Sequence, residues 1–81
     1  MLAQFLFEGM VEPKTSSKGT KYSNIYIKEI DENGEPKMEQ QKYPIFGDEL
    51  CDAFSKIEKN SIIEIDYDVK DISINRVNVY A

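Results

Sequence analysis

Aromatic and basic side chains alternate with apolar ones in KYSNIYIKEI, residues 21–30. Every second residue of a strand shares a face, so Ile25 and Ile27 would point to one side. The other side carries Tyr22, Asn24, Tyr26 and Lys28. Aromatic rings stack on flat ring systems and lysines neutralise negative charge, so this row suits a flat anionic ligand. Tyrosine is also an ordinary strand residue, and a plain solvated face is the competing interpretation.

Positive charge is concentrated near this row, although the formal net charge of the chain is −5. Residues 13–28 hold four lysines and no acid, for a local charge of +4. Residues 29–39 carry −4 (five acids, one lysine), and residues 48–58 carry −3 (four acids, one lysine). Local charge, more than net charge, sets the potential that a ligand meets. The basic segment contains Lys14, Lys18, Lys21 and Lys28.

Three strands are predicted in the first half of the chain. The apolar segment 2–12 contains Gly9, which indicates a bulge or bend. A loop at 13–20 leads to a strand at 21–31, and Asn33-Gly34 predicts a tight hairpin because both residues tolerate positive φ. The chain then returns as a strand at 37–46. Strict alternation there places Phe46 with Lys42 and Pro44, opposite Tyr43 and Ile45.

One helix and two further strands are predicted in the second half. The apolar face of the helix consists of Leu50, Ala53, Phe54 and Ile57. Asp48 is the expected N-cap, and Asn60 the expected left-handed residue that closes the helix. A strand at 61–69 and a turn near Lys70-Asp71 lead to the last strand, 73–80. Its polar side carries Arg76, Asn78 and Tyr80.

This order of elements predicts an all-β domain with one helix. An open sheet of five such strands would leave apolar edges exposed, so closure into a barrel is favoured. A five-stranded Greek-key barrel with its helix between strands three and four is the OB-fold, and we expect residues 1–81 to form one such domain. An open α+β sheet with the helix packed on one face is the alternative architecture.

Composition argues against several functional classes. The chain has no histidine and one cysteine, which excludes zinc sites and histidine-activated nucleophiles. We therefore expect no enzyme, metal or cofactor. One cysteine forms no internal disulfide, no apolar run reaches the roughly 20 residues of a membrane helix, and the start lacks a secretory leader. These features predict a cytoplasmic protein without a membrane partner.

Two stretches resemble the bacterial and phage single-stranded DNA-binding proteins, a family of OB-fold domains. GMVEPKTSSKGTKYSNIYI, residues 9–27, is similar to the start of the family and its loop into strand two. YPIFGDELCDAFSKIEKNSIIEIDYDV, residues 43–69, is similar to its strand ending in Phe-Gly, its helix and its next strand. Gln40 stands where the family has a second aromatic, and the acidic tail is missing after Tyr80-Ala81. The resemblance thus implies a minimal version from a phage or mobile element.

The resemblance implies that Phe46 stacks a base and that strand 21–31 lies on the binding face. Together with the residue pattern it predicts stacking, phosphate and amide contacts by Tyr22, Tyr26, Phe46, Lys14, Lys18, Lys21, Lys28, Lys42, Arg76 and Asn24. Binding would be insensitive to sequence, with RNA possible, and would serve replication or recombination together with the proteins of those processes. Four lysines on phosphates give a slope of log affinity against log salt of about −3. A homodimer or cooperative array would raise the affinity.

An acidic row offers a competing hypothesis. Glu64, Asp66 and Asp68 alternate along strand 61–69, and the helix is acidic as well. This surface would suit a protein-interaction module or a DNA mimic that inhibits a DNA-binding protein.

Overall fold

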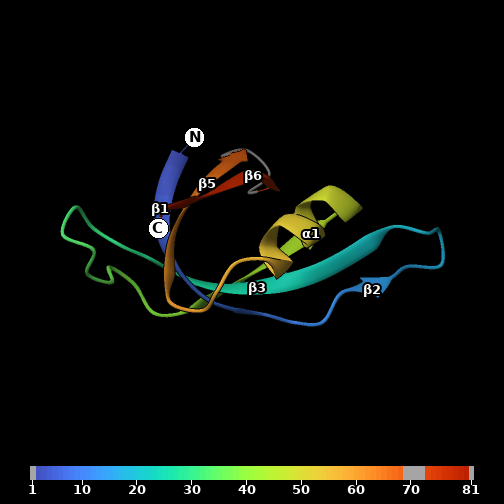
Figure 1. The fold of residues 1–81 in the computed structure, drawn as a ribbon, viewed down its shortest axis with the longest axis horizontal. Coiled ribbons are helices and arrows are strands. Elements are labelled where there is room, and N and C mark those ends of the chain that lie inside the picture. The colour runs from blue at the N-terminus through green and yellow to red at the C-terminus, as the bar shows by residue number, and fades with distance from the viewer. Residues whose placement is uncertain (1, 69–72, 81) are drawn as a thin grey trace.

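The computed structural model describes residues 2–68 and 73–80. Within them the chain forms β1 (Leu2–Met10), β2 (Lys14–Thr15), β3 (Lys21–Glu29), β4 (Gln41–Phe46), α1 (Asp48–Ser55), β5 (Ser61–Asp68) and β6 (Ser73–Tyr80) (Figure 1). All strand pairings are antiparallel, which confirms a mostly β chain with one helix. The turn predicted near Lys70-Asp71 lies outside the described residues. In the part of the chain described, no helix is long and apolar enough to cross a membrane.

Strand β1 is shared by the two halves of the sheet. One of its edges pairs with β3 and the other with β5, and β6 pairs with β5. Strand β4 pairs with one edge of β3. Strand β2 pairs with the other edge, the one that also carries β1. The order β4-β3-β1-β5-β6 bends so that β4 and β6 approach each other. No ladder joins these two strands among the described residues, so the sheet is open along this line.

A bulge in β1 makes the bend that the sequence predicted at Gly9. The register against β3 shifts between Phe7 and Gly9, and Gly9 has a φ of 153°, which favours glycine. Beyond the bulge the chain stays alongside β3, where the Val11 N–H donates to the Asn24 carbonyl at 2.9 Å. Residues 11–24 therefore form a long two-stranded arm that extends from the body of the sheet (Figure 1).

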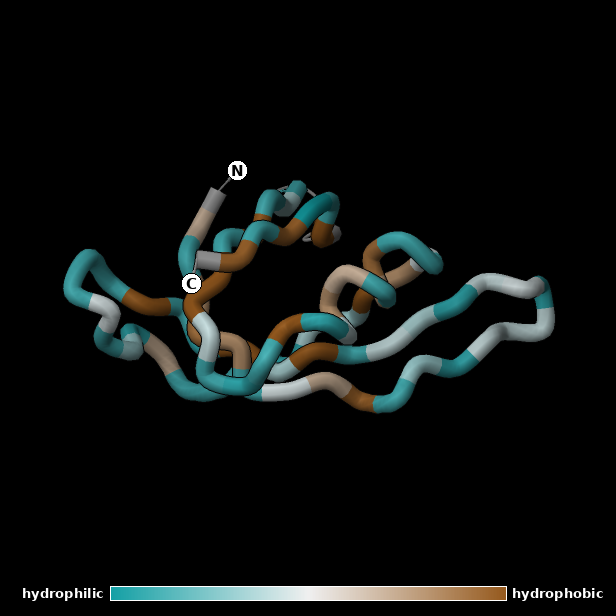
Figure 2. Tube along the Cα trace, viewed as in Figure 1, coloured by the Kyte–Doolittle hydropathy of each residue, from teal (hydrophilic) through white to brown (hydrophobic). Residues whose placement is uncertain are grey.

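The apolar face of each strand lies on the inside of the bend, as the alternation predicted. The core consists of Phe5, Phe7, Ile25, Ile27, Ile45, Cys51, Phe54, Ile63 and Ile65. Helix α1 packs against β3, β4 and β6, and the Phe54 and Phe7 ring centroids lie 5.9 Å apart. Figure 2 shows apolar residues gathered in the body and polar residues along much of the projecting hairpins.

The boundaries of α1 differ from the prediction. Gly47 occupies the N-cap position, with a φ of 98° suited to glycine, so the prediction of Asp48 as N-cap was wrong. Asp48 is instead in the first turn, where its carboxylate faces the positive end of the helix dipole. Asn60 is left-handed as predicted, with a φ of 70°, but it lies beyond the end of α1. There its N–H donates to the Phe7 carbonyl at 2.7 Å and ties the turn to β1.

The connection between β3 and β4 is longer than the predicted tight hairpin. Asp31 Oδ1 accepts the backbone N–H groups of Asn33 at 2.8 Å and Glu35 at 3.0 Å. Gly34 has a positive φ of 81° whereas Asn33 does not, so the two-residue turn expected for Asn-Gly is not formed. The Asp31 side chain competes as a local acceptor and widens the turn, and β4 begins at Gln41.

Removing the ring of Phe54 should destabilise the fold strongly. Phe54 is 1% exposed and packs on Phe7 between the helix and the sheet, so Phe54→Ala leaves a cavity in the core. We expect a loss of about 3–5 kcal/mol in the free energy of unfolding, measured by urea denaturation. Ser55→Ala, one residue along at an exposed position, is the control. A loss below about 1 kcal/mol for Phe54→Ala would contradict the packing of α1 described above.

Candidate nucleic-acid interface

The outer faces of β3 and β4 present aromatic and basic side chains directly opposite one another. The Gly47 N–H donates to the Lys21 carbonyl at 2.7 Å, which makes this a hydrogen-bonded pair. Such pairs alternate along the ladder with pairs that exchange no hydrogen bonds and whose side chains stand closer together. The pairs whose side chains lie on the outer face are of this second type. They are Tyr22 with Phe46, Asn24 with Pro44, and Tyr26 with Lys42. Side chains in these pairs stand about 4.5–5.5 Å apart at Cβ, which brings the rings and the lysine into one row.

Strand β2 adds a further lysine to this face. Lys14 pairs with Tyr22 across the edge opposite β4, so Tyr22 stands between Lys14 and Phe46. We call the set Lys14, Tyr22, Asn24, Tyr26, Lys42, Pro44 and Phe46 the β3–β4 platform. Lys14 and Lys42 are exposed and form no ion pair with any described residue. The platform therefore combines rings with two lysines that have no ion-pair partner in the part of the chain that the structure describes.

Phe46 is the most exposed ring of the platform. Its side chain is 63% exposed, whereas Ile45 beside it is 1% exposed, which confirms the predicted alternation in β4. Tyr43 points to the inside, where it packs against the core and donates its hydroxyl to Gln41 Oε1 at 2.9 Å. Tyr22 and Tyr26 are half-buried on the outer face. An apolar ring left in water next to lysines is a surface suited to stacking.

The arm carries a further lysine beyond the platform. Lys18 is exposed near the end of the arm, in the turn that Ser16 and Gly19 close with a 2.9 Å backbone hydrogen bond. The Thr20 N–H also donates to Ser16 Oγ at 3.1 Å, which braces this turn. From the end of the arm toward the body of the sheet, Lys18 is therefore followed by Lys14 and then by the other platform residues.

Two of the predicted contact residues are not part of the platform and pair with carboxylates. Lys21 has the parity of the buried Ile25 and faces the helix, where its Nζ is 3.1 Å from Asp52 Oδ1. The hydrogen bond and the charge of Asp52 raise the pKa of Lys21. Arg76 lies on β6, and its Nη2 is 3.1 Å from Asp66 Oδ2; this hydrogen bond lowers the pKa of Asp66. Because residues of a strand alternate between its two faces, Lys21 lies on the face opposite Tyr22, and its phosphate contact stays a prediction.

Lys28 is on the predicted face, but it has an intramolecular partner that sequence reasoning missed. Its Nζ lies 3.7 Å from Glu8 Oε2, and the Glu8 Oε1 atom accepts a 3.1 Å hydrogen bond from Gln40 Nε2. Alternation in segment 2–12 places Glu8 on the outer face, opposite Phe7. The pairing of β1 with β3, which no local pattern reveals, brings it to Lys28.

A groove lies where β4 and α1 face β6. It has a volume of about 740 Å³ and is lined by Phe46, Gly47, Asp48, Glu49, Leu50, Ala53, Ile74, Asn75, Arg76, Val77 and Asn78. Phe46 thus borders both this groove and the platform. Arg76 and Asn78 line the same groove as Phe46, although their strand, β6, and that of Phe46, β4, are at opposite ends of the strand order.

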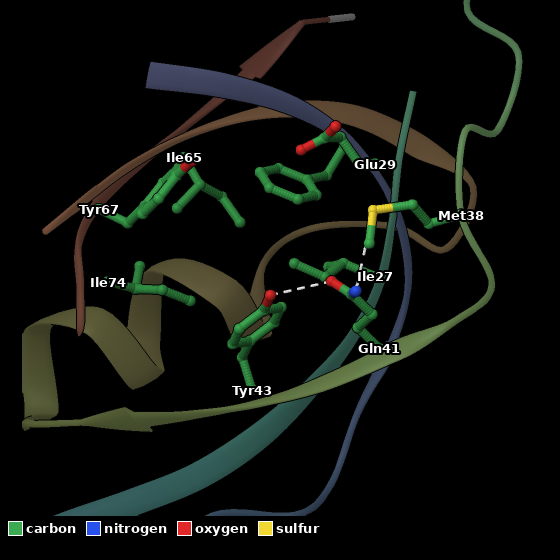
Figure 3. A pocket seen from close by; sticks show the side chains of 9 residues that line it. Ile27, Glu29, Met38, Gln41, Tyr43, Ile65, Tyr67 and Ile74 are labelled. Carbon is green, nitrogen blue, oxygen red and sulfur yellow. Dashed lines mark hydrogen bonds between the residues drawn. The ribbon is translucent and has the colours of Figure 1, made fainter. Parts of the chain in front are cut away.

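A smaller apolar pocket lies inside the bend (Figure 3). It has a volume of about 260 Å³ and lies between Phe5, Ile27, Ile65 and Ile74, with Tyr43, Tyr67, Gln41, Met38 and Glu29 around them. The carboxylate of Glu29 is paired with Lys37 Nζ at 3.2 Å. Among the described residues, no group of three or more His, Cys, Asp and Glu side chains could hold a metal ion. The pocket lies on the inner face of the sheet, opposite the platform.

Replacing Phe46 should leave the fold intact. Its ring is mostly in water, so Phe46→Ala removes little packing, and we expect a change in unfolding free energy within about 0.5 kcal/mol. Urea denaturation measures this, and Ile45→Ala, at the adjacent buried position, provides the contrast with a loss of about 2–5 kcal/mol. Equal losses for the two variants would mean that Phe46 is a core residue.

Comparison with known proteins returns no similar chain: no protein-family model, no curated protein and no solved structure matches this sequence or fold.

Proposed function

We propose that this protein binds single-stranded DNA on the β3–β4 platform with little sequence preference. The observation that carries the proposal is the row of three outward rings, Tyr22, Tyr26 and Phe46, beside two lysines that form no ion pair with a described residue. Bases stack on these rings, and each stacked base contributes about 1–3 kcal/mol. Every base has a flat face, so stacking discriminates weakly between sequences.

The fold supports this proposal through its strand order. We propose that the open sheet is an OB-fold whose barrel is left open between β4 and β6. The shared strand β1, the helix between β4 and β5, and the approach of the two end strands favour this assignment. In OB-folds the face of the second and third strands binds nucleic acids, and β3 and β4 are those strands here.

The phosphate contacts fall to the lysines of this face. Lys14, Lys18 and Lys42 are exposed and form no ion pair with a described residue, whereas Lys28 is held by Glu8. Three contacts give a slope of log affinity against log salt of about −2, shallower than the value of about −3 expected for four lysines. Asn24, between the two tyrosines, supplies an amide for hydrogen bonds to bases or sugars.

The biological role we propose is the protection of single strands during replication or recombination of a phage or mobile element. One domain offers few contacts, so a homodimer or cooperative array would increase the affinity. RNA, and proteins of replication or recombination, are further candidate partners. No bond is made or broken in this function, and the cytoplasm is its natural setting.

Titration of fluorescein-labelled oligo-dT, followed by anisotropy at 50 to 200 mM salt, tests the proposal. We expect binding that weakens with salt at a slope of about −2. Tyr22→Ala and Phe46→Ala should each reduce the affinity by about 5- to 150-fold, because each removes one stacking surface. Tyr67→Phe, whose ring lies at the inner pocket, is the control. Absence of binding at protein concentrations of tens of micromolar, or binding that does not depend on salt, would contradict the proposal.

Two lysines with opposite orientations provide a second test. Lys42→Ala should weaken binding and make the salt slope shallower by about 0.7, because Lys42 lies on the platform opposite Tyr26. Lys21→Ala makes the same change of charge but faces Asp52, so its affinity should stay close to that of the parent protein. The same titration measures both. A larger loss for Lys21→Ala would place the DNA on the helix side.

An acidic surface supports the competing function of a DNA mimic or protein-interaction module. Asp48, Glu49 and Asp52 are exposed on α1, and the first two line the groove beside β6. A protein that binds no oligonucleotide but competes with DNA for a basic DNA-binding protein would favour this second function.

A further inference from the structure

Glu8 is the residue that the β1 bulge inserts next to the platform. The bulge lies between Phe7, which pairs with Ile27, and Gly9, which pairs with Tyr26. Phe7 is buried on the inner face, so Glu8 projects to the outer face, as its contact with Lys28 shows. It therefore stands at the end of the row that begins with Tyr22 and runs through Tyr26. Its carboxylate differs from the rest of the row, which is aromatic, neutral or basic.

The Glu8 carboxylate is held by contacts from two directions. Lys28 Nζ lies 3.7 Å from one oxygen, and Gln40 Nε2 donates to the other at 3.1 Å. The Glu8 side chain is 20% exposed and that of Lys28 is 33% exposed, so the pair is partly shielded from water. Lys28 comes from β3 and Gln40 from the segment just before β4. The contacts thus join three segments across the end of the platform.

This arrangement changes the charge that a bound phosphate chain meets. Glu8 offsets the positive charge of Lys28, so the pair as a whole offers little attraction to a phosphate that approaches past Tyr26. Farther along the outer face, Leu6 of β1 pairs with Ile62 of β5 and Gln4 pairs with Glu64, so these two pairs offer a phosphate no lysine or arginine. The attractive surface is therefore bounded on the side toward β1 and β5.

We infer that Glu8 is a specificity-determining residue that ends the nucleic-acid path at Tyr26 by holding Lys28. The inference rests on the proposed function and specifies the course of the strand. DNA runs from Lys18 at the end of the arm, past Lys14 and over the rings, to Lys42, and does not continue across β1. Lys28 is then a latent phosphate contact, and the site covers few nucleotides.

Replacing Glu8 by its uncharged isostere tests this inference. Glu8→Gln keeps the size and the hydrogen-bonding oxygen but removes the charge, so Lys28 becomes available to a phosphate. We expect tighter binding of oligo-dT and a salt slope steeper by about 0.7, the value for one added contact on a single strand. Glu58→Gln, in the turn after α1, makes the same change of net charge and should leave the slope unchanged. Thermal denaturation verifies that each variant is folded.

Lys28 supplies the complementary measurements. Lys28→Ala in the parent protein should leave the salt slope unchanged, because Glu8 already offsets this lysine. In the Glu8→Gln background the same substitution should abolish the added slope, and this coupling identifies the pair. A slope for Glu8→Gln equal to that of Glu58→Gln overturns the inference, as does a gain that survives in the double variant. If the parent protein and every variant fail to bind, the proposed function fails instead.

Discussion

The burial of one face of β3 is the constraint on which the rest of this structure depends. Ile25 and Ile27 are buried in one core cluster with side chains of β1, β4, β5 and α1, and their burial allows one orientation of the strand. A shift of register by one residue would expose both isoleucines and bury Tyr22, Tyr26 and Lys28, at a cost of several kcal/mol. The outward row is thus held in place by the core behind it.

The bulge at Gly9 converts this sheet into a surface with two different ends. Before the bulge, β1 joins β3 to β5; after it, the chain follows β3 into the arm. The extra residue, Glu8, has no partner in the register between β1 and β3, and its side chain points outward to Lys28. A single irregularity thus bends the sheet, supports the basic arm and places a carboxylate at the opposite end of the platform. Bulges commonly redirect side chains next to functional sites.

The free edge of β4 is protected by Pro44. Pro44 belongs to a pair without hydrogen bonds to β3, so the side on which it lacks an N–H faces away from the sheet. An incoming strand would miss one donor there, which disfavours pairing along β4. Pairing of another strand along this edge is therefore hindered. The exposed ring of Phe46, at the end of β4, remains open to a ligand on the outer face of the sheet.

Local patterns predicted the five longer strands, the helix and the inward faces, because burial of alternate residues depends mainly on neighbours in sequence. They missed β2, whose two residues lie within the loop predicted at 13–20 and pair with β3. The outward direction of Phe46 was implied by the family resemblance, since alternation alone allowed either Phe46 or Tyr43 to face out. Local patterns did predict the bulge at Gly9. They failed where two local signals competed, as at Asp31, whose side chain widened the turn expected from Asn33-Gly34. The groove beside Phe46 also escaped prediction, since it needs β6 to approach β4 from the other end of the sheet.

By itself, the sequence determined which side chains lie on each face of a strand, since a two-residue period and a need to bury isoleucines decide this locally. It also determined that positive charge gathers between residues 13 and 28. Only the tertiary structure decided which of those charges are available. Lys21 is held by Asp52 and Lys28 by Glu8, partners 31 and 20 positions away in the chain. Ion pairs form between neighbours in space, and strand pairing, which depends on the whole core, selects those neighbours.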